Sequence, residues 1–132
     1  MPKRTRQKLE VLPTSELKEH EEVISRQVDI LAEEIQKSGV IKLPILVEKG
    51  SLIILDGHHR FRALSKLGCS RIPCILVDYK NVSLKKLRTD TEVSKNMVID
   101  FALSGRKFPA KTTHHIYKKK VEEINMAIDE LK

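Results

Sequence analysis

The 132-residue sequence predicts a single compact α/β domain in which helices flank a small mixed sheet. Its length fits one domain with one modest core. Hydrophobic residues make up 40% and charged residues 33% of the chain, which is typical of a globular protein. Short apolar runs of strand length also alternate with segments of helical periodicity. We expect a flexible basic tail over residues 1–9 and one domain over residues 10–132.

The first half of the chain predicts a helix, a hairpin and a second helix. The first helix is expected over residues 25–37, and apolar runs at 44–47 and 52–55 around a polar turn predict the hairpin. The second helix is expected from about residue 58 to 67, where Gly68 ends it. The first helix rests on four apolar residues at helical spacing: Ile24, Val28, Leu31 and Ile35.

The second half of the chain predicts one strand and two helices. Residues 72–77 are apolar on both sides, which predicts a central strand. The chain is then polar up to about residue 90, and helical periodicity follows until Gly105. After a loop over residues 106–113 we expect a last helix from about residue 116. The apolar face of that helix would comprise Val121, Ile124, Ile128 and Leu131.

The net charge of +7 is compatible with either nucleic acid or a smaller anion such as a nucleotide. Aromatic residues make up only 4% of the chain and tryptophan is absent, so base-stacking side chains are scarce and a nucleic-acid partner is not favoured. The apolar runs are too short to span a bilayer. The basic N-terminus lacks the apolar stretch of a secretory signal, so the sequence predicts a cytoplasmic protein without a membrane partner.

Two cysteines, Cys69 and Cys74, lie too far apart for a CxxC motif. A structural zinc site would also need two further matched ligands. We therefore expect two reduced and mostly buried thiols.

The strongest candidate site is the string Leu55-Asp56-Gly57-His58-His59-Arg60 at a predicted strand-to-helix junction. A helix start presents unpaired backbone N–H groups and the positive end of the helix dipole, which suit a phosphate. A glycine lets a ligand approach the backbone, and an arginine offers a bidentate donor. The alternative is an aspartate that caps the helix and an arginine in solvent, but two adjacent histidines in the first turn favour a functional site.

A second candidate is the segment 108–115, which ends in Lys111-Thr112-Thr113-His114-His115 before the last predicted helix. Lysine, hydroxyl and imidazole groups there are potential phosphate ligands, although the segment could also be a capped helix start. A third candidate is the acidic pair Glu21 and Glu22, since phosphoryl transfer needs a carboxylate close to the acceptor hydroxyl. The alternative for this pair is a favourable interaction with the dipole of the following helix. Adjacent histidines point in different directions, so a histidine metal centre is not favoured.

With these residues in place, the chain over residues 45–79 resembles the ParB/sulfiredoxin-like superfamily. Sulfiredoxins carry a catalytic cysteine where this chain has His58, and ParB proteins carry a helix-turn-helix region that is not evident after Tyr79. Archaeal free L-serine kinases carry Asp-Gly-His-His-Arg, which is the string at 56–60. They also resemble this chain at His-Glu-Glu (20–22) and at Leu-Ser-Gly…Phe-Pro-x-Lys-Thr-Thr (103–113).

This resemblance implies a compact ParB/sulfiredoxin-like fold and a kinase that converts L-serine to O-phosphoserine for cysteine biosynthesis. The expected cofactors are Mg²⁺ and either ATP or ADP. The implied catalytic residues are Glu21 as the preferred base, Glu22 as its alternative, and Asp56, which would hold the serine amine or Mg²⁺. The implied serine-binding residues are Leu55, Asp56, His59, Thr112, His114 and His115. The implied nucleotide-binding residues are Gly57, His58, His59, Arg60, Lys111 and Thr113.

Two alternatives remain at this point. One is a kinase for another small hydroxylated molecule. The other is a ParB-like regulator that binds nucleotide or DNA without small-molecule chemistry. The carboxylate separates these classes, because a binding module needs the Gly-His-His-Arg string but has no use for Glu21.

Overall fold

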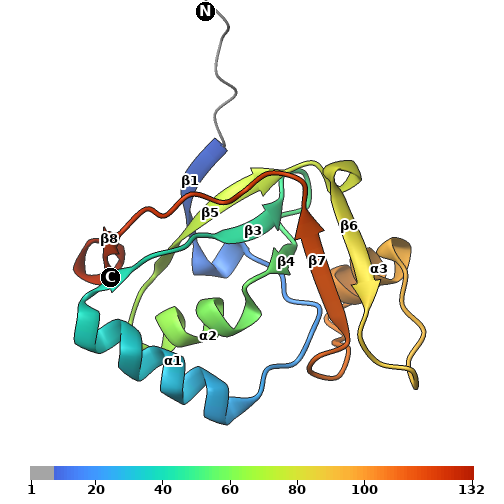
Figure 1. The fold of residues 1–132 in the computed structure, drawn as a ribbon, viewed down its shortest axis with the longest axis horizontal. Helices are drawn as coiled ribbons and strands as arrows, with labels where there is room; N and C mark the ends of the chain where they lie inside the picture. The colour runs from blue at the N-terminus through green and yellow to red at the C-terminus, as the bar shows by residue number, and fades with distance from the viewer. Residues whose placement is uncertain (1–7) are drawn as a thin grey trace, which may run out of the picture.

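The computed structural model describes residues 8–132 (Figure 1). Its main sheet has four strands in the order β1-β5-β3-β4, namely β1 (Lys8–Pro13), β5 (Arg71–Val77), β3 (Ile45–Glu48) and β4 (Ile54–Asp56). Strand β5 runs parallel to β3, whereas β1 pairs antiparallel with β5 and β4 pairs antiparallel with β3. The sheet is therefore mixed, as the sequence predicts, and β5 lies inside it between β1 and β3.

Two helices cover one face of this sheet: α1 (Ser25–Ser38) and α2 (His58–Lys66). Figure 1 shows them side by side beneath the strands. The side chains that meet there come from alternate strand positions, such as Val47 and Cys74, and from buried helix residues, such as Val28 and Leu64. This alternation follows from the two-residue period of a strand.

The opposite face is covered by α3 (Lys95–Ser104) and by an antiparallel pair of strands, β6 (Val82–Lys86) and β7 (Thr113–Tyr117). Its core includes Leu46 and Ile75, which are the strand neighbours of the residues on the first face. Phe101 and Phe108 stack there with their ring centroids 4.0 Å apart. The prediction of a small mixed sheet flanked by helices is confirmed.

The prediction of a last helix from about residue 116 is wrong. Residues 113–117 form β7 instead, and a two-stranded sheet then joins β8 (Met126–Ala127) to β2 (Val40–Ile41). A short 3-10 helix over Ile128–Leu131 ends the chain and buries Ile128 and Leu131. These two residues are three positions apart, a spacing that a 3-10 turn satisfies as well as an α-helix does. Strand β6 was not expected, because its segment is largely polar.

The N-terminal boundary of the domain also differs from the expectation. Lys8 and Leu9, which we assigned to a flexible tail, begin strand β1 and pair with Leu76 and Ile75. The rest of the expected tail lies outside the described residues. In the part of the chain that the structure describes, no helix is long and apolar enough to cross a membrane.

Candidate active site

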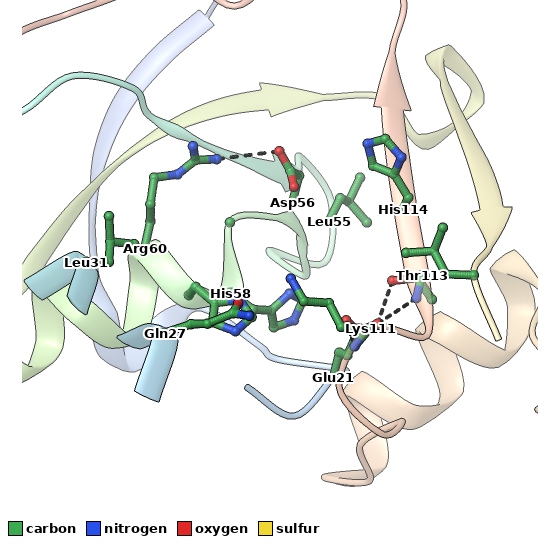
Figure 2. A pocket seen from close by; sticks show the side chains of 13 residues that line it. Glu21, Gln27, Leu31, Leu55, Asp56, His58, Arg60, Lys111, Thr113 and His114 are labelled. Carbon is green, nitrogen blue, oxygen red and sulfur yellow. Dashed lines mark hydrogen bonds and ion pairs between the residues drawn. The ribbon is translucent and has the colours of Figure 1, made fainter. Parts of the chain in front are cut away.

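A cavity of about 480 Å³ opens where the start of α2 meets the loop before β7 (Figure 2). It brings together three stretches that are far apart in the sequence, namely residues 21–31, 55–60 and 111–114, together with Leu87. The two segments that the sequence singled out as separate anion sites therefore line one cavity. Its predicted residues are Glu21, Leu55, Asp56, Gly57, His58, His59, Arg60, Lys111, Thr113 and His114.

The start of α2 is built for close approach by a ligand. Gly57 has a φ of 109°, and a Cβ placed there would lie 2.4 Å from Cγ2 of Ile45, so only glycine fits this turn. No side chain caps the helix, and Asp56 in particular does not. The first backbone N–H groups of α2 are thus left for an anion at the positive end of the helix dipole.

Two cations line the cavity near this helix start. Arg60 lies 3.4 Å from the carboxylate of the half-exposed Asp56, as the dashed line in Figure 2 marks. Its Nε is buried and has no hydrogen-bond partner among the described residues. Lys111 lines the cavity from the loop before β7 and makes no ion pair with any of residues 8–132. Both side chains have donor capacity for an anionic ligand.

Glu21 reaches the cavity as a buried carboxylate with three hydrogen bonds (Figure 2). Its Oε1 accepts from the backbone N–H of Thr113 at 2.9 Å and from the Thr113 hydroxyl at 2.7 Å. Its Oε2 accepts from the N–H of Lys111 at 3.2 Å. Burial raises the pKa of Glu21 above its usual value, and these hydrogen bonds and the Lys111 charge oppose that shift. A carboxylate with a raised pKa suits proton acceptance near neutral pH.

The two histidines at the start of α2 face the stretch that carries Glu21. His58 Nε2 accepts the backbone N–H of His20 at 3.2 Å, and His59 Nε2 accepts the N–H of Ile24 at 3.1 Å. Burial lowers the pKa of both imidazoles, and the positive charge of Lys111 contributes at His59. These bonds were not anticipated from the sequence, which indicated phosphate and substrate contacts instead.

Three predicted site residues do not line the cavity. Glu22 is exposed outside it. Thr112 is fully buried, and its hydroxyl donates to the carbonyl of Pro109 at 2.6 Å. His115 is buried beside Tyr79, whose hydroxyl lies 2.7 Å from His115 Nε2 in a hydrogen bond. Thr112 precedes β7 and is held in the loop by Pro109, whereas His115 lies within β7 and packs against Tyr79 in the core.

Three residues that line the cavity were missed: Gln27, Leu31 and Leu87. Leu31 was assigned to the core face of the first helix, and it does pack, partly buried, against that core while it also lines the cavity. Leu87 is 48% exposed, an unusual position for a large apolar side chain. A leucine among lysines at 85–87 was the only signal in the sequence that could have drawn attention to it.

A second cavity of about 290 Å³ adjoins the first, and the two share Leu31 and Arg60. It lies between the C-terminal half of α1 and residues 40–43, and Ile35, Ile41 and Leu43 contribute apolar surface. The two cavities together make a groove that is charged at the start of α2 and more apolar at its other end.

No group of three or more His, Cys, Asp or Glu side chains within residues 8–132 is arranged to hold a metal ion. Asp56 provides a single carboxylate at the cavity. Mg²⁺ is commonly bound by one or two carboxylates together with substrate phosphates, and this donor set fits such an ion only when a phosphate is bound as well.

The mixed sheet, the uncapped start of α2 and the cations of the cavity define an α/β domain suited to an anionic ligand. Residues 3–91 match the model of the ParB N-terminal domain. The chain therefore belongs to the ParB N-terminal domain family, as the resemblance at residues 45–79 predicted.

Two curated relatives from archaea each match a little more than half of the chain. An ATP-dependent L-serine kinase from Staphylothermus marinus is 35% identical over an alignment of 81 residues, which covers 57% of this chain and 32% of the relative. A ParB-like protein from Sulfolobus acidocaldarius is 41% identical over 73 residues, which are 55% of this chain and 36% of the relative. The chain thus spans about a third of the length of these relatives.

A solved structure of a free serine kinase in complex with AMP has the same fold. Its TM-score is 0.85 at 16% sequence identity, and the match covers 97% of this chain and 95% of the other. The ParB/sulfiredoxin-like fold expected from the sequence is confirmed by this likeness.

Proposed function

We propose that this chain is a free L-serine kinase that transfers a phosphoryl group from ATP or ADP to the serine hydroxyl. The observation that carries this proposal is a buried carboxylate, Glu21, in the same cavity as the uncapped start of α2. A phosphoryl-transfer enzyme needs both features close together, since the acceptor hydroxyl must lose a proton next to the phosphate. The name of the relative from Staphylothermus marinus agrees with this activity.

The groove suggests how a nucleotide would lie. Its phosphates would bind the backbone N–H groups at Gly57 and the first turn of α2, with Arg60 and Lys111 neutralising their charge. The second cavity shares Arg60 with the first, so it would take the nucleoside next to the phosphates. Asp56 would hold Mg²⁺ when that ion is bound, and its charge would help to neutralise that of the phosphates.

Serine would lie between Asp56 and Glu21. The carboxylate of Asp56 would pair with the serine amine where it does not hold Mg²⁺, while His114 would face the serine carboxylate. In the reaction the serine oxygen forms a bond to the terminal phosphorus, and the bond from that phosphorus to the leaving nucleotide oxygen breaks. Glu21 accepts the hydroxyl proton, for which its raised pKa is suited.

The product would be O-phosphoserine, which the archaeal kinases that this chain resembles make for cysteine biosynthesis. A cytoplasmic location is part of the same proposal. Both cysteines, Cys69 and Cys74, are unpaired and buried, and reduced thiols are usual in that compartment.

A second candidate function is a ParB-like regulator that binds nucleotide without transferring phosphate. The relative named ParB-like protein, which is 41% identical over its matched part, favours this alternative. The net positive charge of the chain is compatible with this alternative as well. A regulator would have no need to bury a carboxylate such as Glu21 at the ligand cavity, where burial disfavours its charge.

The deciding experiment is ³¹P NMR of the purified chain with L-serine, Mg²⁺ and either ATP or ADP. The kinase proposal predicts a phosphoserine resonance that grows with the loss of nucleotide. Threonine and homoserine in place of serine would show whether another small hydroxylated molecule is preferred. Nucleotide binding by calorimetry without any phosphorylated amino acid would support the regulator instead.

A further inference from the structure

The adjacent histidines at the start of α2 bind the same distant stretch of backbone. His58 Nε2 accepts the N–H of His20, and His59 Nε2 accepts the N–H of Ile24. These two N–H groups lie on either side of Glu21 in the sequence, one and three residues away. The paired imidazoles thus hold both ends of a short segment, residues 20–24, whose second residue is the buried carboxylate of the cavity.

Both bonds require neutral imidazoles. A histidine nitrogen can accept an N–H only when it carries no proton, so each ring is in the form protonated at Nδ1. The surroundings favour this state. Burial lowers the pKa of both imidazoles, helped at His59 by the charge of Lys111 and at His58 by the charges of four neighbours, namely His20, His115, His59 and Lys107. A neutral imidazole has no positive charge with which to bind a phosphate, and its Nε2 already accepts a hydrogen bond. Arg60 and Lys111, in contrast, are positively charged.

The segment over residues 20–24 belongs to neither a helix nor one of the paired strands. Its other backbone hydrogen bonds go to two partners. Phe108 donates its N–H to the carbonyl of His20 and accepts from the N–H of Glu22, each at 2.8 Å, and Val28 of α1 donates its N–H to the carbonyl of Ile24 at 3.1 Å. Just before the segment, Glu19 accepts two hydrogen bonds from Arg62 of α2, at 2.7 and 3.1 Å. Within residues 8–132, the hydrogen bonds that join α2 directly to residues 20–24 are those of His58 and His59.

We propose that His58 and His59 are positioning residues that set Glu21 at the correct distance from the start of α2. Their hydrogen bonds fix the backbone on both sides of the carboxylate, relative to the helix end that receives the phosphate. The kinetic consequence rests on the proposed kinase function, whereas the anchoring of residues 20–24 does not. Misplacing a catalytic group by about 1 Å can lower a rate by on the order of 10²-fold.

The test compares two substitutions at His59, which is only partly buried and therefore tolerant of change. In His59→Gln the side-chain amide oxygen can take the place of Nε2 as an acceptor, whereas His59→Ala removes the acceptor. We expect His59→Ala to lower kcat by about tenfold or more while the nucleotide Kd changes by less than about twofold, and His59→Gln to recover most of kcat. If nucleotide affinity falls together with kcat and glutamine gives no recovery, His59 is a ligand of the nucleotide and the proposal is wrong.

A second readout does not depend on any kinase activity. We expect the backbone amide of Ile24 to exchange with solvent at least about tenfold faster in His59→Ala than in the wild type, and glutamine to restore its protection. Unchanged exchange of Ile24 would overturn the proposal whatever the kinetics. If exchange responds as expected but the wild type forms no phosphoserine, the anchoring role stands and the proposed kinase function is wrong.

Discussion

Acid should destabilise this domain through its buried histidines. His20 is fully buried and its two ring nitrogens have no hydrogen-bond partner among the described residues. Burial lowers the pKa of His20 to about 4 and that of His115 to about 3, from a usual 6.5. In the unfolded chain both groups bind a proton below pH 6.5, whereas in the folded protein they stay neutral until about pH 4 or below. Their contribution to stability is therefore complete above pH 6.5 and is lost as the pH falls toward the folded-state values.

The expected size of this effect follows from the two pKa values of His20. Between pH 7 and pH 5, preferential protonation of the unfolded state lowers the free energy of unfolding by about 2 kcal/mol for this one residue. The matched variant is His20→Phe, which keeps a ring in contact with His58 and Phe108 but cannot bind a proton. Urea unfolding at pH 7 and pH 5 gives the free energies.

We expect the wild type to lose about 2 kcal/mol more than His20→Phe between pH 7 and pH 5. The other titrating groups are common to both proteins, so the difference reports His20 together with its electrostatic effect on His58 and His115. An identical pH dependence in the two proteins would refute the reasoning, because it would mean that His20 keeps an ordinary pKa in the fold.

Three further substitutions test separate parts of the site. Arg60→Ala should weaken nucleotide binding by about 10- to 150-fold, corresponding to ~1.5–3 kcal/mol for a charge-assisted contact, and unchanged affinity in calorimetry would remove Arg60 from the phosphate site. Gly57→Ala should lower the free energy of unfolding by more than about 1 kcal/mol, because its Cβ would meet Ile45 in a left-handed backbone conformation; wild-type stability in urea would contradict this. Thr112→Val should cost about 1 kcal/mol of stability by leaving the Pro109 carbonyl unpaired, with an unchanged KM for serine; a strongly raised KM would mean that Thr112 does contact substrate.

The elements around the proposed phosphate site could be predicted from the sequence because their signals are local. The run 52–55, the Asp-Gly pair and the apolar spacing of the following helix together indicated a strand-to-helix junction, and β4 and α2 occur there. Gly105 likewise marked the end of α3, where it adopts the left-handed conformation.

The C-terminal region was misjudged because its structure depends on distant partners. β7 exists through pairing with β6, and β8 through pairing with β2, which the local sequence does not reveal. The site residues beside this strand also differ from the prediction, since Thr112 and His115 are buried away from the cavity that Thr113 and His114 line.

The candidate site was partly predictable for a similar reason. Residue type was enough to indicate Arg60 and the acidic pair Glu21 and Glu22, since carboxylates and an arginine near a helix start suit phosphoryl transfer, but the preference for Glu21 rested on the resemblance. The partners of His58 and His59 lie more than thirty residues earlier in the chain, so no local pattern could indicate that their Nε2 atoms bind backbone N–H groups.

The central claim is that the carboxylate of Glu21 is the base in a phosphoryl transfer to serine. Its most direct test compares the phosphoserine turnover of Glu21→Gln with that of Glu22→Gln, whose side chain is exposed outside the cavity. We predict that Glu21→Gln lowers kcat by ~10²–10⁴-fold while its nucleotide Kd stays within about twofold of wild type, and that Glu22→Gln turns over like the wild type. Wild-type turnover in Glu21→Gln, or the loss appearing in Glu22→Gln instead, would contradict the account.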